Sequence, residues 1–215
     1  ERNHLAIIEN YMFRFHKQIQ SFLRLSQNEQ LLGKLDHYEV RFSFPKRSQN
    51  DYQNIKELGG GALYDCGGYT IMLSDILLGR KNTTITEFAP SYQDEMTVDM
   101  GGKGRMVNAD GLTSDFSFSM ADTYCCYAKA FGSKAVLVAP RVLTAPNDLD
   151  VQFSVLDNTG EEIRKIDIGK DDSFLKSIDN FYNCIADDTI RTQNADLIIR
   201  QAKFIEQVKK IGGID

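Results

Sequence analysis

From residue 83 to residue 168 the chain is a succession of short apolar segments separated by turn residues. The segments are rich in β-branched and aromatic residues, which favour an extended backbone. Turns such as Asp110-Gly111 are short enough to join antiparallel neighbours, whereas parallel strands need a long crossover. We therefore predict a mostly antiparallel sheet. Its strands are expected at 83–92, 96–107, 113–121, 124–131, 135–139, 151–156 and 163–168.

An earlier strand is predicted at 34–45, because the apolar Tyr38, Val40 and Phe42 alternate with polar residues before Pro45. The 3.6-residue spacing of apolar side chains predicts four helices. These cover 4–31, 62–78, 171–185 and 193–210. No parallel βαβ unit is expected. The order of elements therefore predicts an α+β fold, with an open, mostly antiparallel sheet and helices packed on one face.

Length and charge bound what the chain can do. Its 215 residues are enough for one sizeable core, so we expect a single domain over 1–215. A net charge of −5 repels phosphate backbones and argues against nucleic acid as the main partner. No apolar run approaches the roughly 20 residues of a membrane-spanning helix. No signal peptide is visible. We expect no membrane partner and a cytoplasmic location.

The cysteines give no sign of a metal site. Cys66, Cys125, Cys126 and Cys184 form no Cys-x-x-Cys pair and have no histidine at metal-ligand spacing. Cys125 and Cys126 are adjacent on a predicted strand and should point to opposite faces. We interpret all four as buried or half-buried thiols in a reducing compartment, and expect no metal.

The segment 59–69 is the strongest candidate for a functional site. Three successive glycines permit positive φ and the close approach of a ligand or another chain. Asp65 and Tyr69 stand four residues apart on the following predicted helix, so they share a face. A carboxylate and a phenol placed together can bind a polyol or relay a proton. The alternative is a flexible turn followed by a first-turn carboxylate that the helix dipole favours.

A second candidate lies at 9–16, where Arg14 and His16 stand among aromatic residues. Arg14 could clamp a carboxylate or phosphate or orient a sugar hydroxyl, and His16 could act as an acid or base. The alternative places both on a solvated helix edge. Other catalytic patterns are missing from the sequence. These are the Gly-x-Ser-x-Gly elbow, His-Glu-x-x-His, the P-loop and the Gly-x-Gly-x-x-Gly of a dinucleotide site.

Four blocks together resemble the Gfo/Idh/MocA oxidoreductase family. They are 11–16 (Tyr-Met-Phe-Arg-Phe-His), 32–35 (Leu-Gly-Lys-Leu), 59–69 and 132–135 (Gly-Ser-Lys-Ala). The resemblance implies an N-terminal Rossmann domain that binds NAD or NADP. It also implies a C-terminal α+β domain whose open sheet covers the nicotinamide edge and often pairs with a second subunit. The implied reaction is hydride transfer between the nicotinamide and a sugar, polyol, sugar nucleotide or related carbonyl.

The resemblance also assigns site residues. Asp65 matches the family's active-site Asp, which positions substrate. Tyr69 matches the position four later, which is His in many members and Tyr in a branch with dihydrodiol and xylose dehydrogenases. Arg14 matches the Arg of the aromatic block. We therefore expect Asp65 and Tyr69 to be catalytic. The residues expected near substrate or cofactor are Arg14, Tyr11, His16, Gly60 and Gly61.

Two departures shape the prediction. The family's catalytic Lys, in a Glu-Lys-Pro motif, is absent, and so is the nucleotide-binding domain; Lys17 stands where a Pro is common. We therefore interpret the chain as a C-terminal substrate-binding and oligomerisation portion that is inactive alone. A homodimer or higher homo-oligomer through the open sheet is expected. A non-catalytic association module that uses the same sheet is the main alternative, and a hydrolase built on the acidic pairs 171–172 and 187–188 ranks last.

Overall fold

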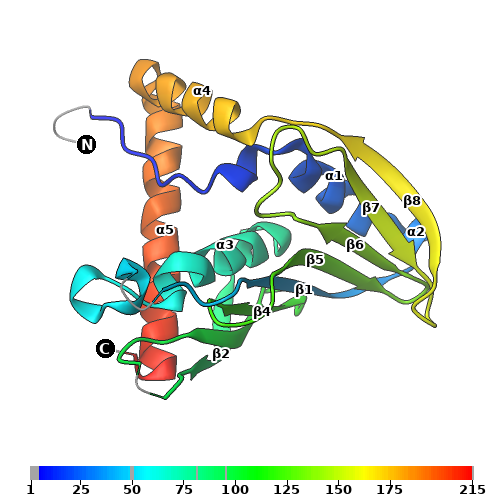
Figure 1. The fold of residues 1–215 in the computed structure, drawn as a ribbon. Coiled ribbons are helices and arrows are strands. Elements are labelled where there is room, and N and C mark those ends of the chain that lie inside the picture. The colour runs from blue at the N-terminus through cyan, green and yellow to red at the C-terminus, as the bar shows by residue number, and fades with distance from the viewer. Residues whose placement is uncertain (1–4, 49–50, 81, 95, 215) are drawn as a thin grey trace.

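The fold is built on one eight-stranded sheet, seen in the computed structural model of residues 5–48, 51–80, 82–94 and 96–214 (Figure 1). The strands lie in the order β2-β3-β4-β1-β5-β6-β7-β8. Their bounds are β1 Leu35–Ser43, β2 Thr84–Ser91, β3 Gly101–Val107, β4 Thr113–Ser119, β5 Cys125–Gly132, β6 Val136–Pro140, β7 Val151–Leu156 and β8 Glu162–Gly169. Each predicted strand segment overlaps one observed strand, with ends that agree to within five residues.

Most neighbouring strands are antiparallel, which confirms the expected sheet, but one pair is parallel. β1 runs parallel to β4, with His37 opposite Thr113 and Ser43 opposite Ser119. The prediction of no parallel unit was therefore wrong. The chain leaves β1, forms helix α3 and the β2–β3 hairpin, and only then returns as β4 beside β1. This long crossover has the length that a parallel pair requires.

Five α-helices complete the described fold. They are α1 Lys17–Ser26, α2 Glu29–Leu32, α3 Gly68–Leu77, α4 Ser173–Ala186 and α5 Asp188–Gly212. Shorter helical turns are η1 Met12–Phe15, η2 Tyr52–Asn54, η3 Lys56–Leu58 and the π-helical η4 Leu63–Gly67. The acidic pairs 171–172 and 187–188 stand at helix starts, where Asp172 caps α4 and Asp187 caps α5. Each helix among the described residues is too short or too polar to cross a membrane.

The first helix is shorter than expected. The described part of 4–31 begins as extended chain, passes through η1 and becomes α-helical only at Lys17. His16 has an extended backbone, and its Nδ1 accepts a hydrogen bond from the Gln18 N–H at 3.2 Å. That bond caps α1 and fixes where it starts. The apolar and aromatic residues before Lys17 have the spacing of a helical stripe, but they lie in irregular chain and in η1.

The core lies between the sheet and the helices on its covered face. Alternate residues of β1 are buried there, among them Tyr38 and Val40. Helix α3 packs on β1 and β4, and nearly all of its side chains are buried. Helix α5 runs from α4 at one end of the molecule to β2 at the other (Figure 1). All four cysteines are free thiols, with Cys126 buried and Cys125 on the opposite face as predicted.

The core makes a matched prediction about two phenylalanines. Phe116 on β4 is 1% exposed, whereas Phe174 on α4 is 52% exposed. Phe116→Ala should lower the free energy of unfolding by about 3–5 kcal/mol, because it removes a buried ring and leaves a cavity. Phe174→Ala should change it by no more than about 0.5 kcal/mol. Urea unfolding measures both, and similar losses in the two variants would contradict this description of the core.

Candidate active site

The glycine triplet folds the chain tightly onto itself. A Cβ on Gly60 would lie 2.6 Å from the Gln53 carbonyl oxygen, and one on Gly61 would lie 2.5 Å from Asp99 Oδ1. Gly61 also has a φ of +124°, which an L side chain rarely adopts. The buried Asp99 accepts a hydrogen bond from the Leu63 N–H at 2.8 Å. The glycines therefore let the helix start dock on Asp99 and Gln53.

The two glycines inside the helix also contact the chain itself. A Cβ on Gly67 would lie 2.8 Å from the Phe118 ring, and one on Gly68 would lie 2.2 Å from the Tyr11 hydroxyl. The space beside both glycines is therefore filled by the protein's own aromatic side chains. Because these glycines have no Cβ, η4 and α3 can pack closely on β4 and the N-terminal segment. Glycine at these positions lowers the stability of the helix.

Asp65, Tyr69 and His16 line one hollow of about 460 Å³. The structure thus brings together three of the residues predicted from the sequence. The hollow lies between the start of α3, the end of β1 and the segment that follows β6. Its wall is largely apolar and aromatic. The main apolar lining residues are Phe13, Phe42, Phe44, Val142, Leu143 and Phe174.

Burial raises the pKa of both acidic groups in the hollow, so each holds its proton to a higher pH than in water. Burial raises the pKa of the Asp65 carboxyl, while a side-chain hydrogen bond from Gln53 and the charge of Arg47 oppose that rise. Burial also raises the pKa of the Tyr69 phenol, and the negative charge of Asp65 raises it further. Tyr69 is therefore a neutral hydroxyl at neutral pH, which can donate a hydrogen bond or proton.

His16 is a fully enclosed polar residue of the hollow, at 1% exposed. Burial lowers the pKa of its imidazole, and the negative charge of Asp171 opposes that effect. Nδ1 accepts the hydrogen bond from the Gln18 N–H, so the proton of the neutral ring belongs on Nε2. Nε2 has no hydrogen-bond partner in the described part of the chain. His16 is thus a neutral donor in the wall.

The other predicted residues lie outside this hollow. Tyr11 is buried behind it and meets Tyr69 edge to face, with ring centroids 4.8 Å apart. Tyr11 therefore supports Tyr69. Arg14 lines a separate hollow, where Nη2 donates to Asn194 Oδ1 at 3.3 Å. Gly60 and Gly61 shape the backbone before η4 and do not line the hollow of Asp65.

Some lining residues had no signal in the sequence. Arg47 lies after β1, in a stretch where no sequence pattern singled it out. Tyr124 and the segment 142–146 reach the hollow because β5 lies beside β1 in the sheet and β6 lies beside β5. Their positions depend on strand order, which local patterns do not specify.

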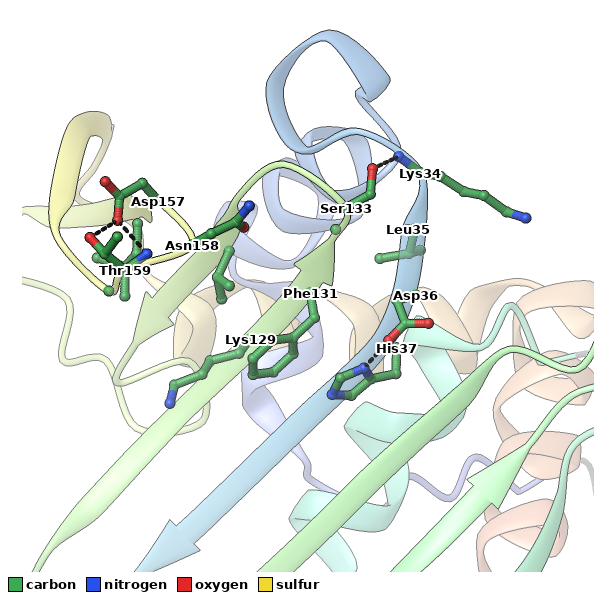
Figure 2. A pocket seen from close by; sticks show the side chains of 14 residues that line it. Lys34, Leu35, Asp36, His37, Lys129, Phe131, Ser133, Asp157, Asn158 and Thr159 are labelled. Atoms are coloured by element: carbon green, nitrogen blue, oxygen red, sulfur yellow. Dashed lines mark hydrogen bonds and ion pairs between the residues drawn. The ribbon is translucent and has the colours of Figure 1, made fainter.

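A larger hollow of about 760 Å³ lies where β1 starts and β5 ends (Figure 2). Several of its polar groups are paired with one another. His37 Nδ1 contacts Asp36 Oδ2 at 2.8 Å, and Ser133 Oγ accepts from the Lys34 N–H at 3.1 Å. The His37 ring also stacks on Phe131, with centroids 4.3 Å apart. Volume alone would make this hollow the candidate active site. The smaller hollow is favoured because it holds the carboxyl of Asp65 and the phenol of Tyr69.

A cofactor or metal would have to fit these surroundings. In the ranges that the structure describes, no group of three or more His, Cys, Asp and Glu side chains is placed to hold a metal ion. The hollow of Asp65 has instead the mixed lining of an organic-ligand site, with aromatic walls and a few polar groups. Its chemistry suits a flat ring beside a hydroxylated molecule.

Comparison with known proteins gives the class. The family model of the GFO/IDH/MocA C-terminal domain matches residues 23–138, which is more than half of the chain. The chain therefore belongs to the GFO/IDH/MocA family, in its C-terminal domain. The expected family and the α+β fold are both confirmed.

Among curated proteins, the chain is similar to dTDP-3,4-didehydro-2,6-dideoxy-alpha-D-glucose 3-reductases. It is 25% identical to the one from Actinomadura kijaniata, over 95% of this chain and 60% of that protein. It is 23% identical to the one from Saccharopolyspora spinosa, over 96% of this chain and 63% of that protein. The chain thus spans about 60% of the length of these relatives.

Solved structures support the fold. KijD10, a 3-ketoreductase from Actinomadura kijaniata in complex with NADP and TDP-benzene, superposes with a TM-score of 0.87 and 24% identity, over 98% of this chain and 64% of that one. The aldose-aldose oxidoreductase from Caulobacter crescentus, complexed with glycerol, has a TM-score of 0.70 and 16% identity, over 95% and 62% of the two chains. At these identities the comparisons establish the fold.

The state of His16 predicts a pH dependence of stability. Below about pH 6.5 the unfolded chain binds a proton at His16 that the folded chain resists, so this residue makes stability fall as the pH falls. His16→Asn keeps a good N-cap side chain but cannot titrate. The loss of unfolding free energy between pH 7 and pH 5 should therefore be smaller in His16→Asn than in the parent chain. Parallel pH profiles from urea titrations would refute the neutral buried imidazole.

Proposed function

We propose that the chain is the substrate-binding domain of an NADP- or NAD-dependent oxidoreductase that reduces a keto sugar carried on a nucleotide. The observation that carries the proposal is the hollow where Asp65 and Tyr69 meet an aromatic wall. The curated relatives named as sugar-nucleotide 3-reductases support the substrate class. Sugars and polyols without a nucleotide are the broader class to which the same site is suited.

The hollow is compatible with one end of a nicotinamide cofactor. Phe13, Phe42 and Phe44 offer the flat apolar surface that a nicotinamide ring would contact. The sequence has no Gly-x-Gly-x-x-Gly motif after a strand, so we propose that a preceding Rossmann domain holds the rest of the dinucleotide. When bound, the cofactor would supply the hydride. This chain's residues would complete the site around the substrate.

The side chains of the hollow divide the remaining work. Reduction of a carbonyl leaves negative charge on its oxygen, and the neutral phenol of Tyr69 can donate a hydrogen bond or proton to that oxygen. Asp65 can accept hydrogen bonds from substrate hydroxyls and so orient the sugar ring. The apolar wall excludes water and strengthens both interactions. Asp65 and Tyr69 are therefore proposed as positioning and proton-donating partners.

The exposed face of the sheet is the proposed surface for homo-oligomer formation. Charged side chains on this face are paired, as in Arg105 of β3 with Asp115 of β4 at 2.6 Å and Arg41 of β1 with Asp122, which follows β4, at 2.5 Å. Such pairing satisfies the charges that a protein interface must cover. We propose a dimer or higher homo-oligomer through this face. The four free thiols agree with the proposed cytoplasmic location.

A non-catalytic association module is the second candidate. That function would be favoured by a filled or crowded groove beside Asp65. The site is instead a hollow of about 460 Å³, and its acid Asp65 forms no ion pair among the described residues, while Arg47 of the lining lies 3.8 Å from Asp51. The observation therefore supports the enzymatic proposal.

The proposal predicts that the chain alone is inactive. The isolated chain should produce no turnover with NADPH or NADH and a panel of keto sugars and sugar nucleotides, because it lacks the dinucleotide motif. The full-length protein should oxidise NADPH or NADH with one member of the panel. Absorbance of the reduced nicotinamide measures both. Turnover by the isolated chain would contradict the proposed division between domains.

The proposed role of Tyr69 predicts a change in kcat. In the full-length protein, Tyr69→Phe should lower kcat by about 10²-fold or more, because the phenol acts on charge that develops in the transition state. KM should change little by comparison. Tyr64→Phe is the matched control, since Tyr64 precedes Asp65 but is 52% exposed and lies outside the hollow. An unchanged kcat in Tyr69→Phe would contradict the proposed proton-donating role of Tyr69.

A further inference from the structure

Arg14 and Arg80 line a hollow that shares no lining residue with the hollow of Asp65. It measures about 360 Å³ and lies between α1, the end of α3 and α5, all on the covered side of the sheet (Figure 1). The turn η1 separates the two hollows, because Phe13 faces the first and Arg14 the second. The floor of the second hollow is apolar. It consists of Ile19, Leu23, Ile76 and Leu197.

The charge of Arg14 is poorly compensated. Its described polar contact is the single bond to Asn194 Oδ1 at 3.3 Å, and its guanidinium stacks on the Phe15 ring at 4.8 Å. Burial lowers the pKa of Arg14, and the charge of Arg80 lowers it further, while Glu9 opposes these effects. Glu9 forms no ion pair with Arg14 within 4.0 Å among the described contacts.

Arg80 is in a similar position. Burial lowers the pKa of its guanidinium, and Asp75 is the acidic group that opposes this. Both carboxylate oxygens of Asp75 are already bound by Arg200, at 2.6 and 2.7 Å. No hydrogen bond or ion pair of the Arg80 side chain occurs within the residues that the structure describes. Two half-buried cations therefore share a hollow without a carboxylate between them.

We propose that this hollow binds a phosphate-type oxyanion. Two guanidiniums present planar sets of N–H donors that match the oxygens of a phosphoryl group, often in bidentate pairs. An oxyanion between Arg14 and Arg80 removes their mutual repulsion and satisfies their free donors. Gln20 on the rim adds a side-chain amide. The occupant is inorganic phosphate or the phosphoryl group of a nucleotide, since both carry the same recognised chemistry.

Thermal unfolding of the chain tests the proposal. Potassium phosphate is titrated against potassium chloride at equal ionic strength, with a nucleoside diphosphate as a second arm. Once phosphate exceeds its Kd, each tenfold increase should raise Tm by roughly 3–5 °C, and chloride should not reproduce this. A nucleoside diphosphate that binds more tightly than phosphate identifies a nucleotide as the source, and equal affinity identifies the phosphoryl group alone. Isothermal titration calorimetry gives the Kd directly.

The variants separate a site from a general salt effect. Arg80→Gln and Arg14→Gln should each abolish the saturable response, and Arg80→Gln should raise Tm without phosphate because one repulsive charge is gone. Arg164→Gln, on an exposed arginine of β8, should respond like the parent. An equal response in all the variants, or none in the parent, overturns the proposal. The proposal is also overturned if Arg80→Gln has a lower Tm than the parent and the parent does not respond to phosphate. Arg80 would then only stabilise the carbonyl end of α3.

Discussion

The Phe118 ring lies against the backbone of Gly67, and the placement of the candidate site depends on this contact. A Cβ on Gly67 would approach the ring to 2.8 Å, so a larger residue would lift η4 and α3 away from β4. In the parallel pair of β1 and β4, Phe42 stands opposite Phe118. Phe42 also packs on Tyr69, with centroids 5.8 Å apart. The helix, both strands and the phenol are therefore linked by the Gly67–Phe118 contact, the register of β1 with β4 and the Phe42–Tyr69 ring contact.

The same seating explains why the helix starts where it does. With η4 held close to the sheet, the Leu63 N–H reaches the buried carboxylate of Asp99, and Gly61 must adopt a positive φ to pass it. A helix N-terminus buried without such an acceptor would leave unsatisfied donors. The glycine triplet thus serves the geometry of the site through the backbone. It lets the backbone place Asp65 and Tyr69 at the hollow.

Local patterns in the sequence predicted the strands well, because alternation and turn residues are properties of neighbouring positions. Tyr38 and Val40 on β1 are buried as their alternation indicated. Spacing also paired Asp65 with Tyr69, and the structure puts both in one hollow. The parallel pairing of β1 with β4 was not predictable from these patterns, because it depends on where the chain returns after the β2–β3 hairpin. Tyr124 reaches the hollow through that same strand order, so no local signal could identify it.

The electrostatics of the hollow bear on the proton-donating role proposed for Tyr69. Burial and the charge of Asp65 both hold the proton on Tyr69, which makes the phenol a stable hydrogen-bond donor but a weak acid. A cation near Tyr69 would lower the pKa of its phenol and so favour proton transfer to the substrate. Arg47 lines the hollow, and its charge lowers the pKa of Asp65. The proposed reduction would therefore be helped by a further positive group close to Tyr69, and the Glu-Lys-Pro lysine that the family resemblance implies has the charge to fill that role.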